Sequence, residues 1–206
     1  MAEQMKKRVI ALGFFDGVHK GHQALLQVCR DRAASLGAAS CAVTFDRHPL
    51  SVILGEPFPL LVEDASLRVF LLTEVGGMDE ALVLPFDKAM ADMPYEAFVR
   101  DLLISKLHAC HLVMGEGYTC GKGGLGTAPR VAALCRELSV GCDIIPNVLW
   151  EGEPISSTRI RNLLLSGKTG QAKELLGHDF LSCESGIRIG GQGGFCHKRR
   201  GGRHGG

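Results

Sequence analysis

The sequence predicts an α/β fold in which helices cover both faces of a mostly parallel sheet. Short apolar segments alternate with segments of helical periodicity between residues 8 and 178 of the 206-residue chain. The apolar segments are nearly continuous, which is typical of strands that are buried on both faces. The hydrophobic fraction of 46% is that of an ordinary globular domain.

The alternation defines each element in turn, from apolar runs for strands and 3.6-residue periodicity for helices. The predicted strands are Val9–Phe14, Ala39–Phe45, Glu80–Leu84, Cys110–Met114 and Cys142–Ile145. The predicted helices are Gly21–Leu36, Asp64–Val75, Pro94–Leu107, Pro129–Leu138, Ser157–Leu165 and Thr169–Leu176. Open parallel sheets bind ligands beyond the carboxyl ends of their strands. Functional side chains are therefore expected in the segments that follow the strands.

The segment after the first strand carries the strongest functional signal. Apolar residues 9–15 lead through a tight turn into His-Lys-Gly-His at residues 19–22, where a helix opens. A helix start offers unpaired backbone N–H groups and a positive dipole end to an anion. Gly21 lets a phosphate approach the backbone, and the imidazoles of His19 and His22 can donate to its oxygens. The segment indicates phosphate chemistry on a nucleotide; the alternative is a solvated surface pair of histidines.

A second candidate phosphate site lies at the start of the fifth predicted helix. It reads Ser-Ser-Thr-Arg-Ile-Arg at residues 156–161. Ser156 or Ser157 can cap the helix, and this is the simpler interpretation. Three hydroxyls beside two arginines can also hold a polyphosphate. Arg159 and Arg161 point different ways on a helix, so we expect one of them to clamp a leaving pyrophosphate.

Two further polar segments follow predicted strands. Residues 44–49, Thr-Phe-Asp-Arg-His-Pro, end the second strand, and the glycine-rich residues 115–124 follow the fourth. Lys122 in the glycine-rich segment can contact phosphate. The segment lacks the helix-opening Gly-Lys-Ser/Thr of a P-loop, which argues against γ-phosphoryl transfer of the P-loop kind.

Composition limits the partners and the compartment. The formal net charge is +1, so bulk electrostatics indicate no nucleic-acid partner, and the apolar runs are too short to cross a membrane. The eight cysteines form no Cys-x-x-Cys pair, which favours free thiols in a reducing cytoplasm. Residues 181–206 are rich in Gly and Arg, and we expect a disordered tail there.

Four motifs together resemble the adenylyltransferase module of bacterial bifunctional riboflavin kinase/FAD synthetase. The motifs are residues 13–23, 43–50, 115–126 and 155–161, and they follow that family's order and usual spacing. The resemblance implies a Rossmann-like nucleotidyltransferase fold for residues 1–180. It also implies transfer of AMP from ATP to FMN with Mg²⁺, giving FAD and pyrophosphate by in-line attack of the FMN phosphate on the ATP α-phosphorus.

The resemblance assigns roles to individual residues of this chain. Catalytic roles fall to His19, His22 and Arg161. ATP contacts fall to Gly13, Phe14, Phe15, Asp16, Gly21, Ser156, Ser157 and Thr158. FMN contacts fall to Asp46, His48, Pro49, Tyr118 and Lys122. The motifs assign no protein ligand to the metal.

The chain departs from the family pattern in two respects. Gly117 replaces the usual Asp or Asn of the glycine-rich segment, and Cys120 replaces an aromatic residue that would stack on the flavin. The Pro-Thr-Ala-Asn signature of the riboflavin kinase module is missing, so we expect no kinase domain or activity in this chain. Two alternatives follow: an impaired nucleotide- or flavin-binding protein, and a nucleotidyltransferase for another phosphorylated acceptor.

Overall fold

A computed structural model describes residues 6–179, and its centre is a five-stranded parallel sheet with the order β3-β2-β1-β4-β7. The strands are β1 (Arg8–Leu12), β2 (Ala39–Phe45), β3 (Glu80–Leu84), β4 (Ala109–Gly115) and β7 (Gly141–Ile145). All five predicted strands are therefore confirmed. The chain fills the sheet outward from β1 in one direction and then from β4 in the other. The strand order thus reverses between β1 and β4, where such folds bind ligands.

The central strand β1 shows why the sheet needs a helical layer on each face. Successive side chains of a strand point to opposite faces. Val9 and Ala11 enter one core, which contains α1, while Ile10 and Leu12 enter the other. All four side chains are almost fully buried.

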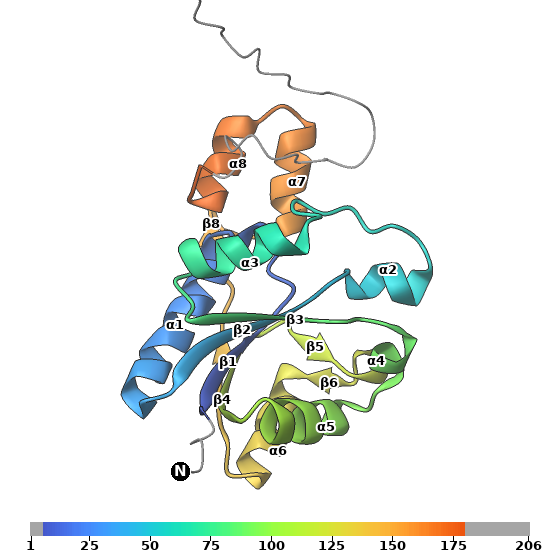
Figure 1. Ribbon diagram of the computed structural model, residues 1–206. Helices are drawn as coiled ribbons and strands as arrows, with labels where there is room; N and C mark the ends of the chain where they lie inside the picture. Colours follow the sequence, from blue (N-terminus) through green and yellow to red (C-terminus); the bar gives the residue numbers. More distant parts are fainter. Residues whose placement is uncertain (1–5, 180–206) are drawn as a thin grey trace, which may run out of the picture.

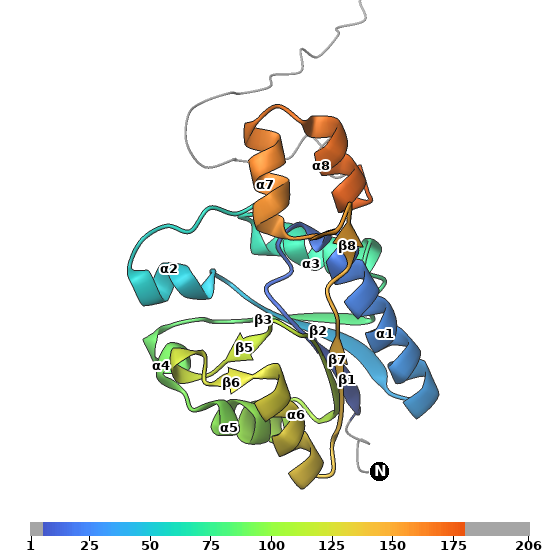
Figure 2. The same cartoon turned by 180° about the vertical axis from the view of Figure 1, so that it is seen from behind.

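Helices cover both faces, as predicted (Figures 1 and 2). Side chains of one group of helices fill the core on the Val9 side, and those of a second group fill the core on the Ile10 side. The first group is α1 (Lys20–Leu36), α3 (Ala65–Glu74), α7 (Ser157–Leu165) and α8 (Thr169–Leu176). The second group is α5 (Tyr95–Ala97), η2 (Phe98–Lys106) and α6 (Ala128–Glu137).

The helix predicted over residues 94–107 is only partly α-helical. A single α-turn, α5, continues as the π-helix η2. The backbone N–H of Leu107 donates to the carbonyl of Leu102 at 2.9 Å, five residues back. The wider turn keeps Phe98, Val99 and Leu103 buried. Hydrophobic periodicity does not distinguish such a segment from an α-helix.

The remaining elements are short and were not predicted, because they contain too few residues to show a period. They are α2 (Pro49–Leu54), α4 (Lys88–Asp92), the hairpin of β5 (Thr119–Cys120) and β6 (Gly126–Thr127), the hairpin of β8 (Leu149–Trp150) and β9 (Glu153–Pro154), and the 3₁₀ turns η1 (Asp16–Val18) and η3 (Lys122–Gly124). The glycine-rich segment is therefore a hairpin with a short turn rather than a plain loop.

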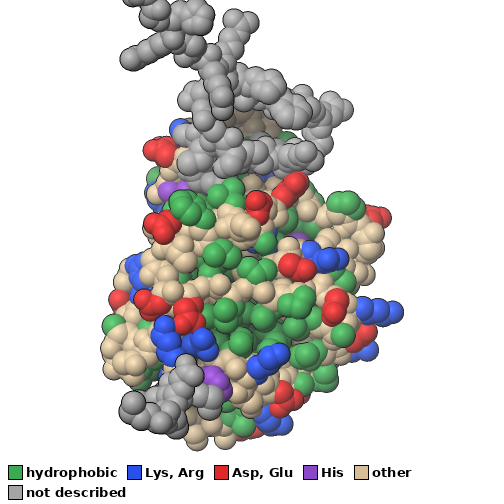
Figure 3. Space-filling model, viewed as in Figure 1, with side chains coloured by type: hydrophobic (Ala, Val, Ile, Leu, Met, Phe, Trp, Pro, Cys, Tyr) green, Lys and Arg blue, Asp and Glu red, His purple; other side chains and the backbone are tan. Residues whose placement is uncertain are grey.

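Side-chain chemistry at the surface is mixed. Figure 3 shows hydrophobic side chains near the middle of one face, where the edge strand β3 runs, with charged side chains around them. The six cysteines between residues 6 and 179 are all free, and Cys29, Cys41 and Cys135 are buried. No helix within this range is long and apolar enough to cross a membrane. The expected tail, residues 181–206, lies outside the described residues.

Candidate active site

A cavity of about 380 Å³ lies at the carboxyl ends of β1, β4 and β7, where the strand order reverses. Residues from six parts of the chain line it. They come from the segment 12–25, His48, Phe58 and the segments 115–118, 145–148 and 155–161. The cavity therefore combines the two candidate phosphate segments, which stand more than 130 residues apart in the sequence.

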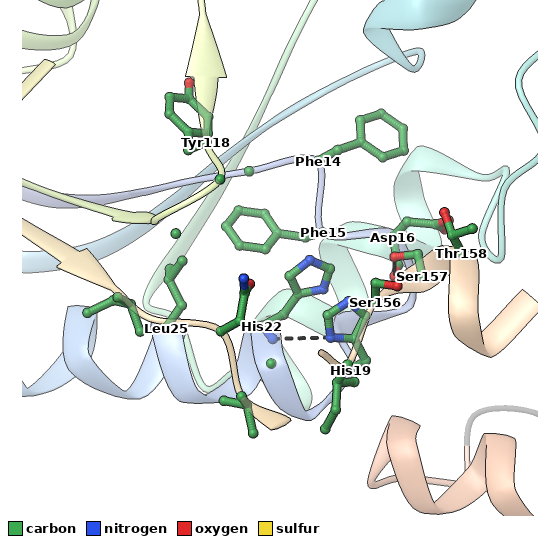
Figure 4. A pocket seen from close by; sticks show the side chains of 18 of the residues that line it. Phe14, Phe15, Asp16, His19, His22, Leu25, Tyr118, Ser156, Ser157 and Thr158 are labelled. Atoms are coloured by element: carbon green, nitrogen blue, oxygen red, sulfur yellow. Dashed lines mark hydrogen bonds between the residues drawn. The ribbon is translucent and has the colours of Figure 1, made fainter. Parts of the chain in front are cut away.

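The two histidines of the first motif stand together at the start of α1. His19 is the N-cap residue, and its Nδ1 accepts a hydrogen bond from the backbone N–H of His22 at 3.3 Å. The two rings stack with centroids 3.7 Å apart, and the edge of Phe15 meets the His22 ring. Figure 4 shows both imidazoles beside the hydroxyl side chains at the start of α7. Phe15 and Val18 adopt positive φ angles of 56° and 42°, a strained backbone that is typical of functional loops.

Burial keeps both imidazoles neutral. Desolvation lowers the pKa of His19 to about 4. Desolvation, together with the neighbouring His19, holds the pKa of His22 well below its usual value. Because Nδ1 of His19 accepts a hydrogen bond, the proton of the neutral ring lies on Nε2, which becomes a donor. Nδ1 of His22 is buried and has no partner among residues 6–179, so the ring still has an unused polar atom.

Asp16 shapes the histidine loop. Its carboxylate accepts hydrogen bonds from the backbone N–H groups of Leu61 and Val62 at 2.8–2.9 Å. Burial raises the pKa of this carboxyl, although those hydrogen bonds oppose the shift. Asp16 lines the cavity, but its oxygens are already engaged. The geometry therefore favours a role of Asp16 in orienting the histidine loop over the ATP contact that the resemblance assigns to it.

The start of α7 supplies the opposite wall. Ser156 is the N-cap residue and accepts from the backbone N–H of Arg159. Ser157 donates from Oγ to the backbone carbonyl of Asp16 at 2.9 Å, which fastens this helix to the histidine loop. Ser156, Ser157 and Thr158 all line the cavity. The three hydroxyls thus lie where the sequence predicted, and the cap is Ser156.

Only one arginine of the second motif reaches the cavity. Arg161 is 6% exposed, donates to Pro59 O and, at 3.0 Å, to Thr158 Oγ1, and lines the cavity. Arg159 instead donates to the backbone carbonyls of the β8–β9 hairpin. The expected division between the two arginines is therefore present in the structure.

Aromatic rings form the wall on the β2 side. His48 stacks on Phe58 with centroids 3.9 Å apart, and it makes a T-shaped contact with Phe14 with centroids 4.7 Å apart. Burial, with Arg161 and Arg68 nearby, lowers the pKa of His48 to about 4. The fully buried Arg68 lies 4.3 Å from the centre of the Phe14 ring and fixes it from behind. The result is a neutral aromatic wall against which a planar ring can pack.

Three residues expected to contact FMN do not line the cavity. Asp46 accepts from the backbone N–H of Phe86 at 2.8 Å, and Pro49 forms the first turn of α2. Lys122 is exposed and pairs with Asp92 at 3.0 Å. The motif placed each of them near the sheet edge, but neighbouring groups hold their side chains elsewhere. Tyr118 does line the cavity, and burial raises its pKa well above the usual value, so its phenol stays protonated.

The two departures from the family pattern have different structural settings. Gly117 lines the cavity, and a Cβ placed there would meet no atom within 4 Å. Cys120 is not part of the cavity wall; its Sγ faces the carbonyl of Gly126. Cys120 therefore does not leave a gap at the cavity, whereas Gly117 does.

The motifs missed several residues of the cavity wall, above all Phe58 and Asn147. Phe58 lies in a segment without periodicity, and only the folded chain brings it to His48. Asn147 follows β7 directly, so its place after an apolar strand was the available signal. Among the described residues, no group of three or more His, Cys, Asp or Glu side chains is placed to hold a metal ion.

Two helix starts that face one cavity at the reversal of a parallel sheet define a nucleotide-binding α/β protein of the Rossmann-like class. The model of the FAD synthetase family matches residues 1–159 of this chain. The chain belongs to the FAD synthetase family.

Relatives agree with this membership. The chain is 33% identical over 180 residues to the bifunctional riboflavin kinase/FMN adenylyltransferase of Listeria monocytogenes, with 85% of this chain and 55% of the relative covered. It is 35% identical to a putative bifunctional riboflavin kinase/FMN adenylyltransferase of Geobacillus thermodenitrificans, with 82% of this chain and 89% of that relative covered. The Escherichia coli K12 relative is 28% identical, over 84% of this chain and 55% of its own length.

A solved structure that this chain resembles is titled as a macrolide-efflux protein from Streptococcus pneumoniae. It superimposes with a TM-score of 0.73 and 30% identity, over 84% of this chain and 57% of that one. The chain thus spans a little over half the length of most of these proteins.

Proposed function

We propose that this chain is an FMN adenylyltransferase, which transfers AMP from ATP to FMN and releases pyrophosphate. One observation carries the proposal: the starts of α1 and α7, with His19, His22 and Arg161, face the same cavity. These helix starts offer backbone N–H groups, hydroxyls and a guanidinium to phosphate oxygens from two sides. Family membership and the names of the relatives point to FMN as the acceptor.

The proposed reaction is a direct displacement. A phosphate oxygen of FMN attacks the α-phosphorus of ATP, and the bond to the bridging oxygen of pyrophosphate breaks. The Nε2–H of His19 and the His22 ring donate to the phosphate oxygens as charge develops. Arg161, Thr158 and the serines hold the departing β- and γ-phosphates. Catalysis then consists of positioning and charge stabilisation, without a covalent enzyme intermediate.

The isoalloxazine ring of FMN has a candidate wall of the cavity in this proposal. The aromatic wall of Phe14, His48 and Phe58 suits the isoalloxazine ring of FMN, because aromatic rings stack with favourable geometry. Since Phe14 packs against His48, we place it with FMN rather than with ATP, to which the resemblance assigns it. Tyr118 lies across the cavity from the hydroxyl side chains of α7 (Figure 4).

Mg²⁺ enters the proposal as part of the substrate MgATP. Asp16 has its oxygens engaged by backbone N–H groups, and the described residues contain no three-residue metal cluster. Mg²⁺ bound to phosphates keeps several waters and needs no protein cage. Its contribution is to neutralise phosphate charge. We place the enzyme in the cytoplasm, with residues 1–180 as the catalytic domain and 181–206 as a tail outside it.

The decisive experiment measures FAD and pyrophosphate from FMN, ATP and Mg²⁺, with His22→Ala as the test variant. Loss of a donor to the developing charge is expected to lower kcat by about 100-fold or more. Circular dichroism should show that the variant remains folded. Binding of ATP or FMN without pyrophosphate release by the wild-type chain would instead support an impaired binding protein.

Two further experiments use the same assay. Replacing FMN with other phosphorylated acceptors tests whether the chain is a nucleotidyltransferase for another acceptor, and a higher kcat/KM than with FMN would support that alternative. Replacing FMN with riboflavin tests kinase activity, and we expect no FMN to form.

A further inference from the structure

The cavity has a second side wall whose chemistry differs from that of the aromatic wall. It lies at the ends of β4 and β7, on the far side of the histidine loop from His48. The wall includes the bare backbone of Gly117 and the side chains of Ile145, Asn147 and Val148. Ile145 and Val148 are apolar, and Asn147 adds a polar side chain.

Glu116 determines how the Asn147 carboxamide is oriented. One oxygen of Glu116, Oε1, accepts from the backbone N–H of Asn147 at 3.1 Å and from its side-chain Nδ2 at 2.7 Å. A carboxylate only accepts hydrogen bonds, so the amide group facing it must be the NH₂. The Asn147 Oδ1 is therefore turned away from Glu116, and no group within residues 6–179 donates to it. Since Asn147 lines the cavity, this wall presents a fixed acceptor.

The Oδ1 acceptor of Asn147 is complementary to an uncharged ligand group that donates a hydrogen bond. Phosphate oxygens at neutral pH are mainly acceptors, and the nearby Glu116 carboxylate repels them. The phosphate-binding groups lie instead on α1 and α7. The apolar side chains of Ile145 and Val148, with the open space at Gly117, suit a flat ring that carries an amino group.

We propose that Asn147 reads the 6-amino group of the donor purine and so selects adenine over a 6-oxo purine. Glu116 is the positioning residue that keeps Oδ1, rather than NH₂, on the ligand side. The inference rests on the proposed function, because it takes the nucleotide triphosphate as the AMP donor. It adds a specificity-determining residue that the sequence motifs do not contain.

ATP and ITP test the proposal, because ITP carries an acceptor oxygen in place of the 6-amino group. Calorimetric Kd values and kcat/KM values are measured for both nucleotides with the wild-type chain, Asn147→Ala and the control Asn162→Ala. Asn162 is an exposed residue of α7 outside this cavity. We expect the wild type and the control to prefer ATP by about tenfold, the worth of one hydrogen bond and one mismatched acceptor. In Asn147→Ala the preference for ATP over ITP should nearly disappear, because ATP binds more weakly and its kcat/KM falls.

A third variant separates positioning from simple packing. Glu116→Ala leaves the Asn147 carboxamide free to turn, so the ATP preference should fall although Asn147 is still present. A purely structural role for Glu116 would lower ATP and ITP turnover equally and leave the ratio unchanged, which would overturn its assignment.

Other outcomes would overturn the proposal in distinct ways. If Asn147→Ala lost affinity and kcat/KM equally for ATP and ITP, Asn147 would not contact the 6-position of the purine. A changed discrimination against 2′-deoxy-ATP, with the ATP to ITP ratio intact, would place the ribose at Asn147. A changed KM for FMN alone would place the acceptor there. If the wild type binds both nucleotides but forms no FAD, the proposed function fails, while the two Kd values still decide base selection.

Discussion

The imidazole rings of His19 and His22 stack face to face, with centroids 3.7 Å apart and an interplanar angle of 15°. Two protonated rings at this distance would repel each other in a poorly hydrated site. Burial removes the conflict, because it lowers the pKa of His19 to about 4 and holds the pKa of His22 well below its usual value. The pair is therefore suited to donate to phosphate as neutral rings.

The first prediction concerns acid stability. The pKa of His19 is about 4 in the folded chain and 6.5 in the unfolded chain, so the unfolded chain binds more protons between these values. The contribution of His19 is fully present above pH 6.5 and is lost as the pH falls toward 4. The loss is on the order of 3 kcal/mol in the free energy of unfolding. Urea unfolding at pH 7 and pH 4.5 measures it.

The variant His19→Asn provides the comparison for that prediction. Asn caps a helix as well as His19 does here but does not titrate. The free energy of unfolding of His19→Asn should therefore fall less between pH 7 and pH 4.5 than that of the wild type. Equal losses in the two chains would show that His19 is not the titrating group.

The second prediction compares how much the buried Asp16 carboxylate and an exposed helix-capping carboxylate contribute to stability. Asp16→Asn places an NH₂ group against the backbone N–H groups of Leu61 or Val62, and we expect a loss of about 2 kcal/mol in stability. The matched control is Asp64→Asn, since the exposed Asp64 caps α3 and Asn caps equally well. Urea midpoints measure both. Similar midpoints for the two variants would contradict the anchoring role of Asp16.

The third prediction compares the two arginines of α7. Arg161→Lys loses the planar fork that can hold a phosphate in two hydrogen bonds, so kcat/KM for ATP should fall by about 100-fold. Arg159→Lys changes a residue that binds the β8–β9 hairpin, and kcat/KM should stay within about twofold of the wild type. Steady-state pyrophosphate release measures both. A larger effect at Arg159 would reverse the assignment.

The fourth prediction uses two glycines of the glycine-rich segment. A Cβ at Gly117 meets open space and the backbone φ is not left-handed, so Gly117→Ala should change stability by no more than about 1 kcal/mol. Gly121 has φ +72°, and a Cβ there would lie 2.5 Å from the Tyr95 backbone. Gly121→Ala should therefore cost about 2 kcal/mol or more. Thermal unfolding distinguishes them, and equal Tm values would refute the difference.

The space at Gly117 also allows a gain-of-function test. A Cβ at Gly117 would meet no atom within 4 Å, and Gly117→Asn restores the residue type usual in the family. A hydrogen bond from this carboxamide to the nucleotide, whose base is proposed to lie beside Gly117, should raise kcat/KM for ATP by about fivefold to tenfold. No change would show that the wild-type cavity already satisfies the groups that this residue would meet.

The sheet was predictable from sequence because its signals are local. Each central strand is an apolar run, and the strand Val9–Phe14 required only its own residues to be recognised. The π-helix η2 was not predictable, because apolar spacing over only nine residues does not distinguish hydrogen bonds to the fifth preceding residue from those to the fourth. The two-residue strands of the hairpins are too short to carry any pattern.

The candidate site was predicted where a motif determines both residue type and position. His19, Arg161 and the three hydroxyls reach the cavity as expected. Asp46 and Lys122 do not, because the backbone N–H of Phe86 and the carboxylate of Asp92 hold their side chains. Such competition depends on groups distant in the sequence, and a motif does not describe it.

The hydrogen bond from Ser157 Oγ to the Asp16 carbonyl joins residues 141 positions apart. A chain emerging from the ribosome has α1 early, but it lacks half of the proposed phosphate-binding groups until Arg161 has left the exit tunnel. Under the proposed function, the nucleotide is therefore retained only late in biosynthesis. A nucleotide bound between α1 and α7 would then join segments far apart in the sequence and oppose unfolding of either one.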